Sequence, residues 1–141
     1  MPLLSGIDHC HINVNNLSNA VTWYEKVLGF KVVEELAFWD ETGKGPLTLQ
    51  DRNTTTRLAL FEGQVRSKGI AFGATGEQFI AWLAHFKSMD IKTVLADHGV
   101  TFSIYFKDES DNSHEITSHD YEHIKMFYPS VEQGSHSAKK S

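Results

Sequence analysis

Three polar side chains alternate with apolar residues near the start of the chain. They are His9, His11 and Asn13 in the stretch IDHCHINV, residues 7–14. The alternation predicts a strand, in which side chains two positions apart share one face. These side chains should therefore form a polar face, on which imidazoles could donate hydrogen bonds to a ligand or bind a metal ion.

A second stretch that could do chemistry is SIYFKDESDNSHEITSHDY, residues 103–121. Two strand-like runs flank the polar turn KDESDN, so we expect a hairpin with its turn outside. Alternation sets Tyr105 opposite its apolar neighbours, which suits a cavity-facing hydroxyl at least as well as a core tyrosine. Glu115 lies more than a hundred positions from His9. Without further information, His9 could equally be a solvated strand residue and Glu115 a carboxylate at the rim of a cavity.

Composition predicts one compact domain whose partner is a small molecule. A chain of 141 residues with 40% hydrophobic residues can bury one ordinary core. Its formal net charge of -5 gives no basic footprint for nucleic acid, and no Lys/Arg cluster suggests a membrane surface. Cys10 is the single cysteine, which excludes an intrachain disulfide framework. Because no window has a signal-peptide or membrane-spanning pattern, we expect a cytoplasmic protein.

The elements that must position these residues begin with the order β-α-β-β-β. After the strand at 7–14, LSNAVTWYEKVLGF (17–30) predicts a helix that Ser18 caps and Gly29 ends. FKVVEEL (30–36) predicts a strand. Turn signals at TGKGP and DRNTT divide the next stretch into a meander of two or three strands.

The second half repeats this order with an offset of about 60 residues. KGIAFGA (68–74) predicts a short strand, and the helix that follows has Thr75 and Gln78 at capping-box spacing. IKTVLAD, VTFSIYFKD and SHEITS supply three further strands. Each module alone would leave a sheet face bare, and two such sheets side by side would enclose a cavity.

These elements resemble a known superfamily. IDHCHINVNNLSNAVTWYEKVLGFKV, RLALFEG, GIAFGA and SIYFKDESDNSHEIT, in this order, are similar to the vicinal oxygen chelate superfamily of glyoxalase I, fosfomycin and bleomycin resistance proteins and extradiol dioxygenases. The resemblance implies an α+β fold in which two paired βαβββ modules form a half-open mixed β-barrel around a cavity. We expect one domain at residues 5–130, with module one at 5–64, module two at 66–118 and a C-terminal segment at 119–130, followed by a disordered tail at 131–141.

Within the superfamily, residues 98–115 are most similar to the metal-binding module of catechol 2,3-dioxygenase-like enzymes. This similarity implies a metal-ligand histidine at His9, a metal-ligand carboxylate at Glu115, an active-site tyrosine at Tyr105 and a second-sphere histidine at His98. The extradiol pattern has another ligand histidine where this chain has Gly69. The two-histidine, one-carboxylate set that suits iron(II) is therefore incomplete, and a histidine at this position is expected to complete it.

Other side chains extend the predicted site. His11 could reach the same ion as a substitute ligand, or it could line the cavity beside Asn13 as a hydrogen-bond donor. Phe38 and Trp39, in the less regular AFWDET, are candidates for a substrate wall. His98, in the loop-like ADHGV, could also be an ordinary exposed histidine. We expect the histidines that follow the turn to lie on the surface: His114, His119 and His123.

Three functions follow from the resemblance. The first is an enzyme of the extradiol ring-cleavage type, in which a divalent metal, iron(II) by analogy, chelates two adjacent substrate oxygens while Tyr105 and His98 move protons. The second is a metal-free, non-catalytic small-molecule binder of the bleomycin-resistance type, which Gly69 favours. The third, a glyoxalase-like isomerase, lacks a first-module carboxylate because Ala59 and Phe61 stand near its expected place. Relatives commonly pair two chains, so we also expect a homodimer.

Overall fold

The described residues of the computed structural model are 1–40, 43 and 45–128, without the side chains of 38–40. They divide into two compact units. The first unit comprises Met1–Ser67 and Asp108–Asn112, and the second comprises Lys68–Lys107 and the described residues from Ser113 onward. The predicted tail at 131–141 lies outside the described residues.

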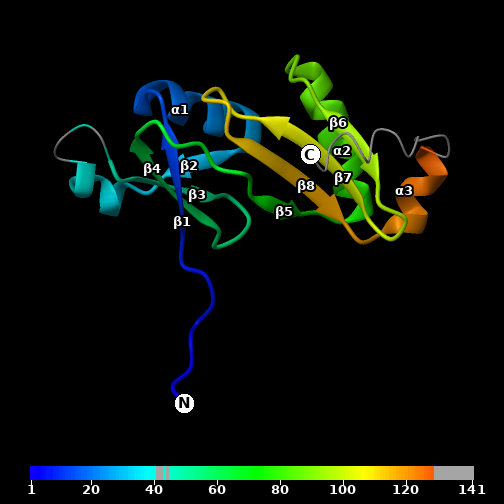
Figure 1. Ribbon diagram of the computed structural model, residues 1–141, viewed down its shortest axis with the longest axis horizontal. Helices are drawn as coiled ribbons and strands as arrows, with labels where there is room; N and C mark the ends of the chain where they lie inside the picture. The colour runs from blue at the N-terminus through cyan, green and yellow to red at the C-terminus, as the bar shows by residue number, and fades with distance from the viewer. Residues whose placement is uncertain (41–42, 44, 129–141) are drawn as a thin grey trace. The chain divides into compact units, whose positions relative to one another are not determined.

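The first unit contains a four-stranded sheet in the order β1-β4-β3-β2 (Figure 1). Strands β1 and β4 are parallel, and the other pairings are antiparallel. Helix α1 runs directly into a π-helical stretch, η1, and a 3-10 helix, η2, follows β2. The elements are β1 (Cys10–Val14), α1 (Leu17–Trp23), η1 (Tyr24–Leu28), β2 (Phe30–Val32), η2 (Glu34–Asp40), β3 (Leu47–Asp51) and β4 (Arg57–Glu62).

Helix α1 begins at a different cap from the one predicted. The side chain of Asn16 accepts a hydrogen bond from the backbone N–H of Asn19 at 2.8 Å, whereas Ser18 lies inside the helix. Gly29 ends the helical stretch as expected, in the left-handed conformation with φ of 78°. The apolar stripe of the helix packs against the sheet, and the core between them includes Ile12, Val14, Tyr24, Leu49, Leu58 and Leu60.

Two strands of the first unit are shorter than the sequence predicted. FKVVEEL forms a strand only over β2, because the adjacent acidic residues Glu34 and Glu35 break the alternation and begin η2 instead. Strand β1 begins at Cys10, since its partner β4 begins at Arg57 and β1 pairs from Cys10 and Leu58 onward. Residues 1–9 extend from β1 as an exposed segment (Figure 1).

The second unit repeats the topology of the first. Its strands have the order β5-β8-β7-β6, in which β5 and β8 are parallel. The side chain of Thr75 caps α2 by accepting from the N–H of Gln78 at 3.2 Å, as predicted. Phe79, Phe86 and Ile104 are fully buried between this helix and the sheet. The elements are β5 (Ala71–Gly73), α2 (Gly76–Ser88), β6 (Val94–Asp97), β7 (Phe102–Lys107), β8 (Ser113–Ser118) and α3 (Tyr121–Phe127).

The α+β class and the repeat of two βαβββ modules are confirmed. Both sheets are open, with β1 and β2 at the edges of the first and β5 and β6 at the edges of the second, so neither closes into a barrel among the described residues. None of the helices in the described part of the chain has the length and apolar character that crossing a membrane requires.

Candidate functional site

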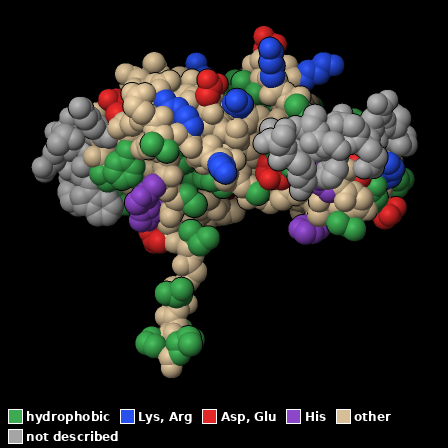
Figure 2. Space-filling view, viewed as in Figure 1, with side chains coloured by type: hydrophobic (Ala, Val, Ile, Leu, Met, Phe, Trp, Pro, Cys, Tyr) green, Lys and Arg blue, Asp and Glu red, His purple; other side chains and the backbone are tan. Residues whose placement is uncertain are grey.

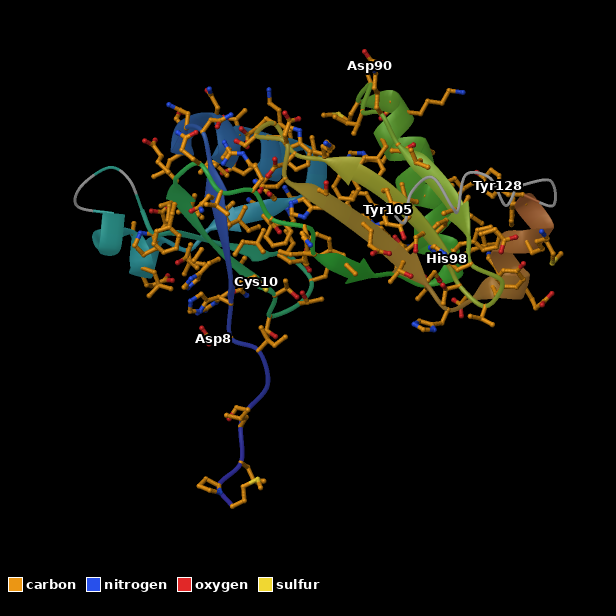
Figure 3. The ribbon with its side chains drawn as sticks, in the orientation of Figure 1. Asp8, Cys10, Asp90, His98, Tyr105 and Tyr128 are labelled. Carbon is orange, nitrogen blue, oxygen red and sulfur yellow. The ribbon has the colours of Figure 1, made fainter. Side chains whose placement is uncertain are left out.

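Two exposed histidines lie side by side at the start of the first sheet. Nε2 of His9 is 3.0 Å from Nε2 of His11, and their ring centroids are 4.9 Å apart. Nδ1 of His9 lies 2.8 Å from Oδ2 of Asp8. Figure 2 shows histidine side chains gathered beside the N-terminal extension, and Figure 3 labels Asp8 and Cys10, which flank His9 in the chain. The shared polar face that the alternation predicted is therefore present.

The geometry of this pair suits two neighbouring ligands of one divalent ion. When Nδ1 of His9 donates its hydrogen to Asp8, Nε2 keeps a lone pair that can accept from His11 or bind a metal. Two nitrogens at about 2.1 Å from one ion, at an angle between about 90° and 109°, would be about 3.0 to 3.4 Å apart. The observed 3.0 Å separation lies within that range. A hydrogen bond between the two imidazoles and a shared ion therefore both fit this geometry.

Asp8 is held as a carboxylate beside the pair. The hydrogen bond with His9 is the main cause that lowers the pKa of Asp8, and the charge of Arg57 lowers it further. A carboxylate on the far nitrogen of a ligand histidine fixes the orientation of its ring. Asp8 can therefore position His9 for a ligand on Nε2.

Asn13 occupies the same face two residues beyond His11. It is half-buried, and its side chain packs against Gly63, where an added Cβ would come within 2.9 Å of it. His11 contacts Phe61 edge-on, with ring centroids 5.2 Å apart. The side chains of Phe38 and Trp39, predicted as a substrate wall, lie outside the described residues.

In the second unit, Tyr105 and His98 form a hydrogen-bonded pair. The Tyr105 hydroxyl is 3.0 Å from Nε2 of His98, and both side chains are half-buried (Figure 3). Glu115 is the cross-strand partner of Tyr105. Burial, followed by the negative charge of Glu115, raises the pKa of Tyr105, which keeps its hydroxyl protonated and able to donate. The structure thus brings three predicted site residues together on one face of the second sheet.

Gly69 has a backbone reason to be glycine. Its φ is +128°, a region that other residues rarely adopt, and an added Cβ would lie 2.7 Å from the backbone oxygen of Ser113. A histidine here would require the backbone to move. The effect of Gly69→His on metal binding therefore stays a prediction, and the substitution carries a cost in backbone strain.

Two further expectations are corrected. His114 is not on the surface: it is 1% exposed, and its Nδ1 accepts a 3.3 Å hydrogen bond from the N–H of Ile70. It lies on the helix-covered face of β8, where its ring contacts Phe72 and Phe106. The turn KDESDN is not outside either, because it contains the buried residues Asp108, Ser110 and Asn112. His119 and His123 are exposed as predicted.

The full predicted ligand set is not assembled. Among the described residues, no group of three or more His, Cys, Asp or Glu side chains is arranged to hold a metal ion. His9 belongs to the first unit and Glu115 to the second. The role of Glu115 as a ligand therefore stays a prediction.

The sequence reasoning missed a row of polar side chains across the first sheet. Arg57 pairs with Gln50, and Gln50 pairs with Lys31, so all three share the face of His11. The alternation in RLALFE already placed Arg57 on one face with Ala59. The pairing register between neighbouring strands places these three side chains in one row, and the sequence alone does not reveal that register.

Comparison with known proteins identifies the fold and the family. A search of curated proteins found no match. A lactoylglutathione lyase from Agrobacterium tumefaciens is 18% identical, with a TM-score of 0.70 over 84% of this chain and 97% of that one. A variant of the genomically encoded fosfomycin resistance protein from Listeria monocytogenes is 17% identical, with a TM-score of 0.68 over 86% and 97%. The model of the Glyoxalase/Bleomycin resistance protein/Dioxygenase superfamily matches residues 6–116, and the chain belongs to this superfamily.

Proposed function

We propose that the protein is a metal-dependent enzyme that acts on a small molecule with adjacent oxygen atoms, and that its reaction is of the extradiol ring-cleavage type. The observation that carries the proposal is the 3.0 Å approach of the Nε2 atoms of His9 and His11, with Asp8 on the far nitrogen of His9. Imidazole nitrogens suit iron, zinc and related divalent ions. His9 and His11 would be the metal ligands, with iron(II) as the ion by analogy.

The metal and the chain's own residues would have separate roles in the reaction. The metal, when bound, would hold the two adjacent oxygens and favour loss of a proton from a hydroxyl. Asp8 would keep the His9 ring in position. In the second unit, the Tyr105 hydroxyl shares a hydrogen bond with His98, so Tyr105 would be a proton donor and His98 would replace the proton.

A solved relative supports the choice of ligand class. The fosfomycin resistance protein variant from Listeria monocytogenes was solved with Mn(II) and 1S,2S-dihydroxypropylphosphonic acid. That ligand has hydroxyls on adjacent carbons, and the ion is divalent. Mn(II) is therefore a second candidate for the bound ion, beside iron(II).

A second candidate function is a metal-free binder of small molecules. The observation that favours it is the conformation of Gly69, which makes a side-chain ligand at that position costly in backbone strain. The alternative differs from the first in one measurable respect, since ligand binding would not depend on a metal.

We also propose that the chain forms a homodimer. Each open sheet has two edge strands. Leu3, Leu4 and Ile7 are at least 86% exposed in the segment that leads into the edge strand β1. Exposed apolar side chains beside a strand edge favour pairing with a second copy.

Turnover of catechol by metal-loaded protein tests the reaction type. Protein loaded anaerobically with Fe(II) or Mn(II) should consume dioxygen and catechol, and chelator-treated protein should not. Tyr105→Phe should lower kcat by about 100-fold because the proton donor is lost, whereas the control Tyr128→Phe should not. Metal uptake without consumption of catechol, or of a catechol that carries a carboxylate, would exclude the extradiol type.

A further inference from the structure

A row of polar side chains crosses the face of the first sheet that carries the histidine pair. Arg57, Gln50 and Lys31 are successive cross-strand partners on β4, β3 and β2. His11 pairs with Ala59, which lies two residues along β4 from Arg57 on the same face, and the charge of Arg57 acts on Asp8 beside His9. The row therefore runs from the histidine pair toward Lys31.

Arg57 is oriented by its neighbour. Its Nε donates a 2.7 Å hydrogen bond to Oε1 of Gln50, and Nε2 of Gln50 donates to the backbone oxygen of Thr54. This anchoring uses one donor of a guanidinium that has five. Within the part of the chain that the structure describes, the guanidinium makes no other hydrogen bond. Its terminal nitrogens are therefore able to meet an anion in a fixed orientation.

A cleft of about 310 Å³ lies along this row. Three cationic side chains line it: Lys31, Arg52 and Arg57. Its acidic lining residues are Glu34, Glu35 and Asp51, of which Asp51 already accepts a 2.8 Å hydrogen bond from Thr54. The volume lies at the lower end of the range for small-molecule sites. A small molecule that carries an anionic group can therefore occupy the cleft.

We infer that Arg57 and Lys31, with Gln50 between them, form a binding site for an anionic oxygen group such as a carboxylate or a phosphate. Arginine recognises such groups through two parallel hydrogen bonds, and lysine adds a point charge. This inference deepens the proposed function and rests on it in one respect: the substrate held at the histidine pair would carry a carboxylate or phosphoryl group besides its adjacent oxygens.

Calorimetric titration of chelator-treated protein with inorganic phosphate tests the site without a metal. Wild type should bind phosphate, and Arg57→Gln should weaken binding about tenfold because a charge-assisted bond is lost. Lys31→Gln should weaken it about threefold, and because Lys31 is exposed this variant keeps the fold. The control Lys92→Gln, an exposed lysine of the second unit, should leave binding unchanged.

The acidic lining supplies a test of opposite sign. Glu34→Gln with Glu35→Gln should tighten phosphate binding by removing negative charge from the cleft. No phosphate binding by wild type, or equal binding by wild type, Arg57→Gln and Lys31→Gln, would overturn the inference. Mn(II) titration of the same preparations reports separately on the proposed function: metal uptake without phosphate binding overturns this inference alone.

Discussion

The hydroxyl of Tyr24 donates a 2.6 Å hydrogen bond to Oδ2 of Asp108, across 84 positions of sequence. Both residues are buried, and Asp108 also accepts bonds from the backbone N–H groups of Ser110 and Asn112. Burial and the neighbouring Asp108 carboxylate raise the pKa of Tyr24, so the hydroxyl stays protonated and donates at neutral pH. A polar turn is thus part of the interior of the first unit.

Tyr24→Phe should lower the free energy of unfolding by about 1.5 to 3 kcal/mol, because a buried carboxylate loses a donor. Urea unfolding followed by circular dichroism measures this. Tyr128→Phe is the matched control and should change stability by less than about 0.5 kcal/mol. Equal stability of the two variants would mean that the Tyr24 bond contributes nothing.

The sequence predicted the elements of this fold better than the environment of the polar residues. Periodicity located α2 and the strand pairs, and alternation placed His9 and His11 on one face. The burial of Asp108 and His114 was missed, because local pattern does not reveal which turn or strand face another element covers. The constraint on Gly69 was missed for a similar reason. The backbone of Ser113, a residue distant in the sequence, leaves little room for a side chain at this position.

Gly69→Ala should destabilise the protein by about 1 to 3 kcal/mol, because alanine must adopt a positive φ and its Cβ would meet Ser113. Gly73→Ala is the matched control within the same segment, since nothing lies within 4 Å of its added Cβ. It should leave stability nearly unchanged. Thermal unfolding of the two variants compares them directly, and similar melting temperatures would contradict the argument from backbone conformation.

Asp97 should make the free energy of unfolding depend on pH in the acidic range. It is buried, which alone would raise its pKa, but hydrogen bonds from Gly99, Lys125 and Tyr121 outweigh burial and lower the pKa below its ordinary value of 3.8. A carboxylate with a lowered folded pKa stabilises above the unfolded value, and this stability is lost as pH falls through the folded pKa.

Asp97→Asn should therefore cost about 1 to 3 kcal/mol at pH 7, and the difference from wild type should shrink below about pH 3.9. Urea unfolding of Asp97→Asn and wild type, at pH 7 and again below about pH 3.9, measures this difference in the free energy of unfolding. Asp90→Asn, at an exposed position, serves as the control. A difference that grew on acidification would have the wrong sign.

The proposed dimer predicts a mass in solution of twice the 15.9 kDa of one chain. Light scattering coupled to size exclusion measures this mass. Replacing Leu3, Leu4 and Ile7 together by serine should shift the equilibrium toward the monomer, because it removes exposed apolar side chains. A single-chain mass for wild type at high concentration would contradict the proposal.

The most direct test of the central claim is the affinity of the chelator-treated protein for Mn(II) and Fe(II), measured by anaerobic titration. The wild type should bind one ion per chain, and His9→Ala and His11→Ala should each weaken binding by at least about tenfold. Asp8→Asn should weaken it less, and the exposed His119→Ala should have no effect. Undiminished binding in both His9→Ala and His11→Ala, or no binding by the wild type, would contradict a metal centre at this pair.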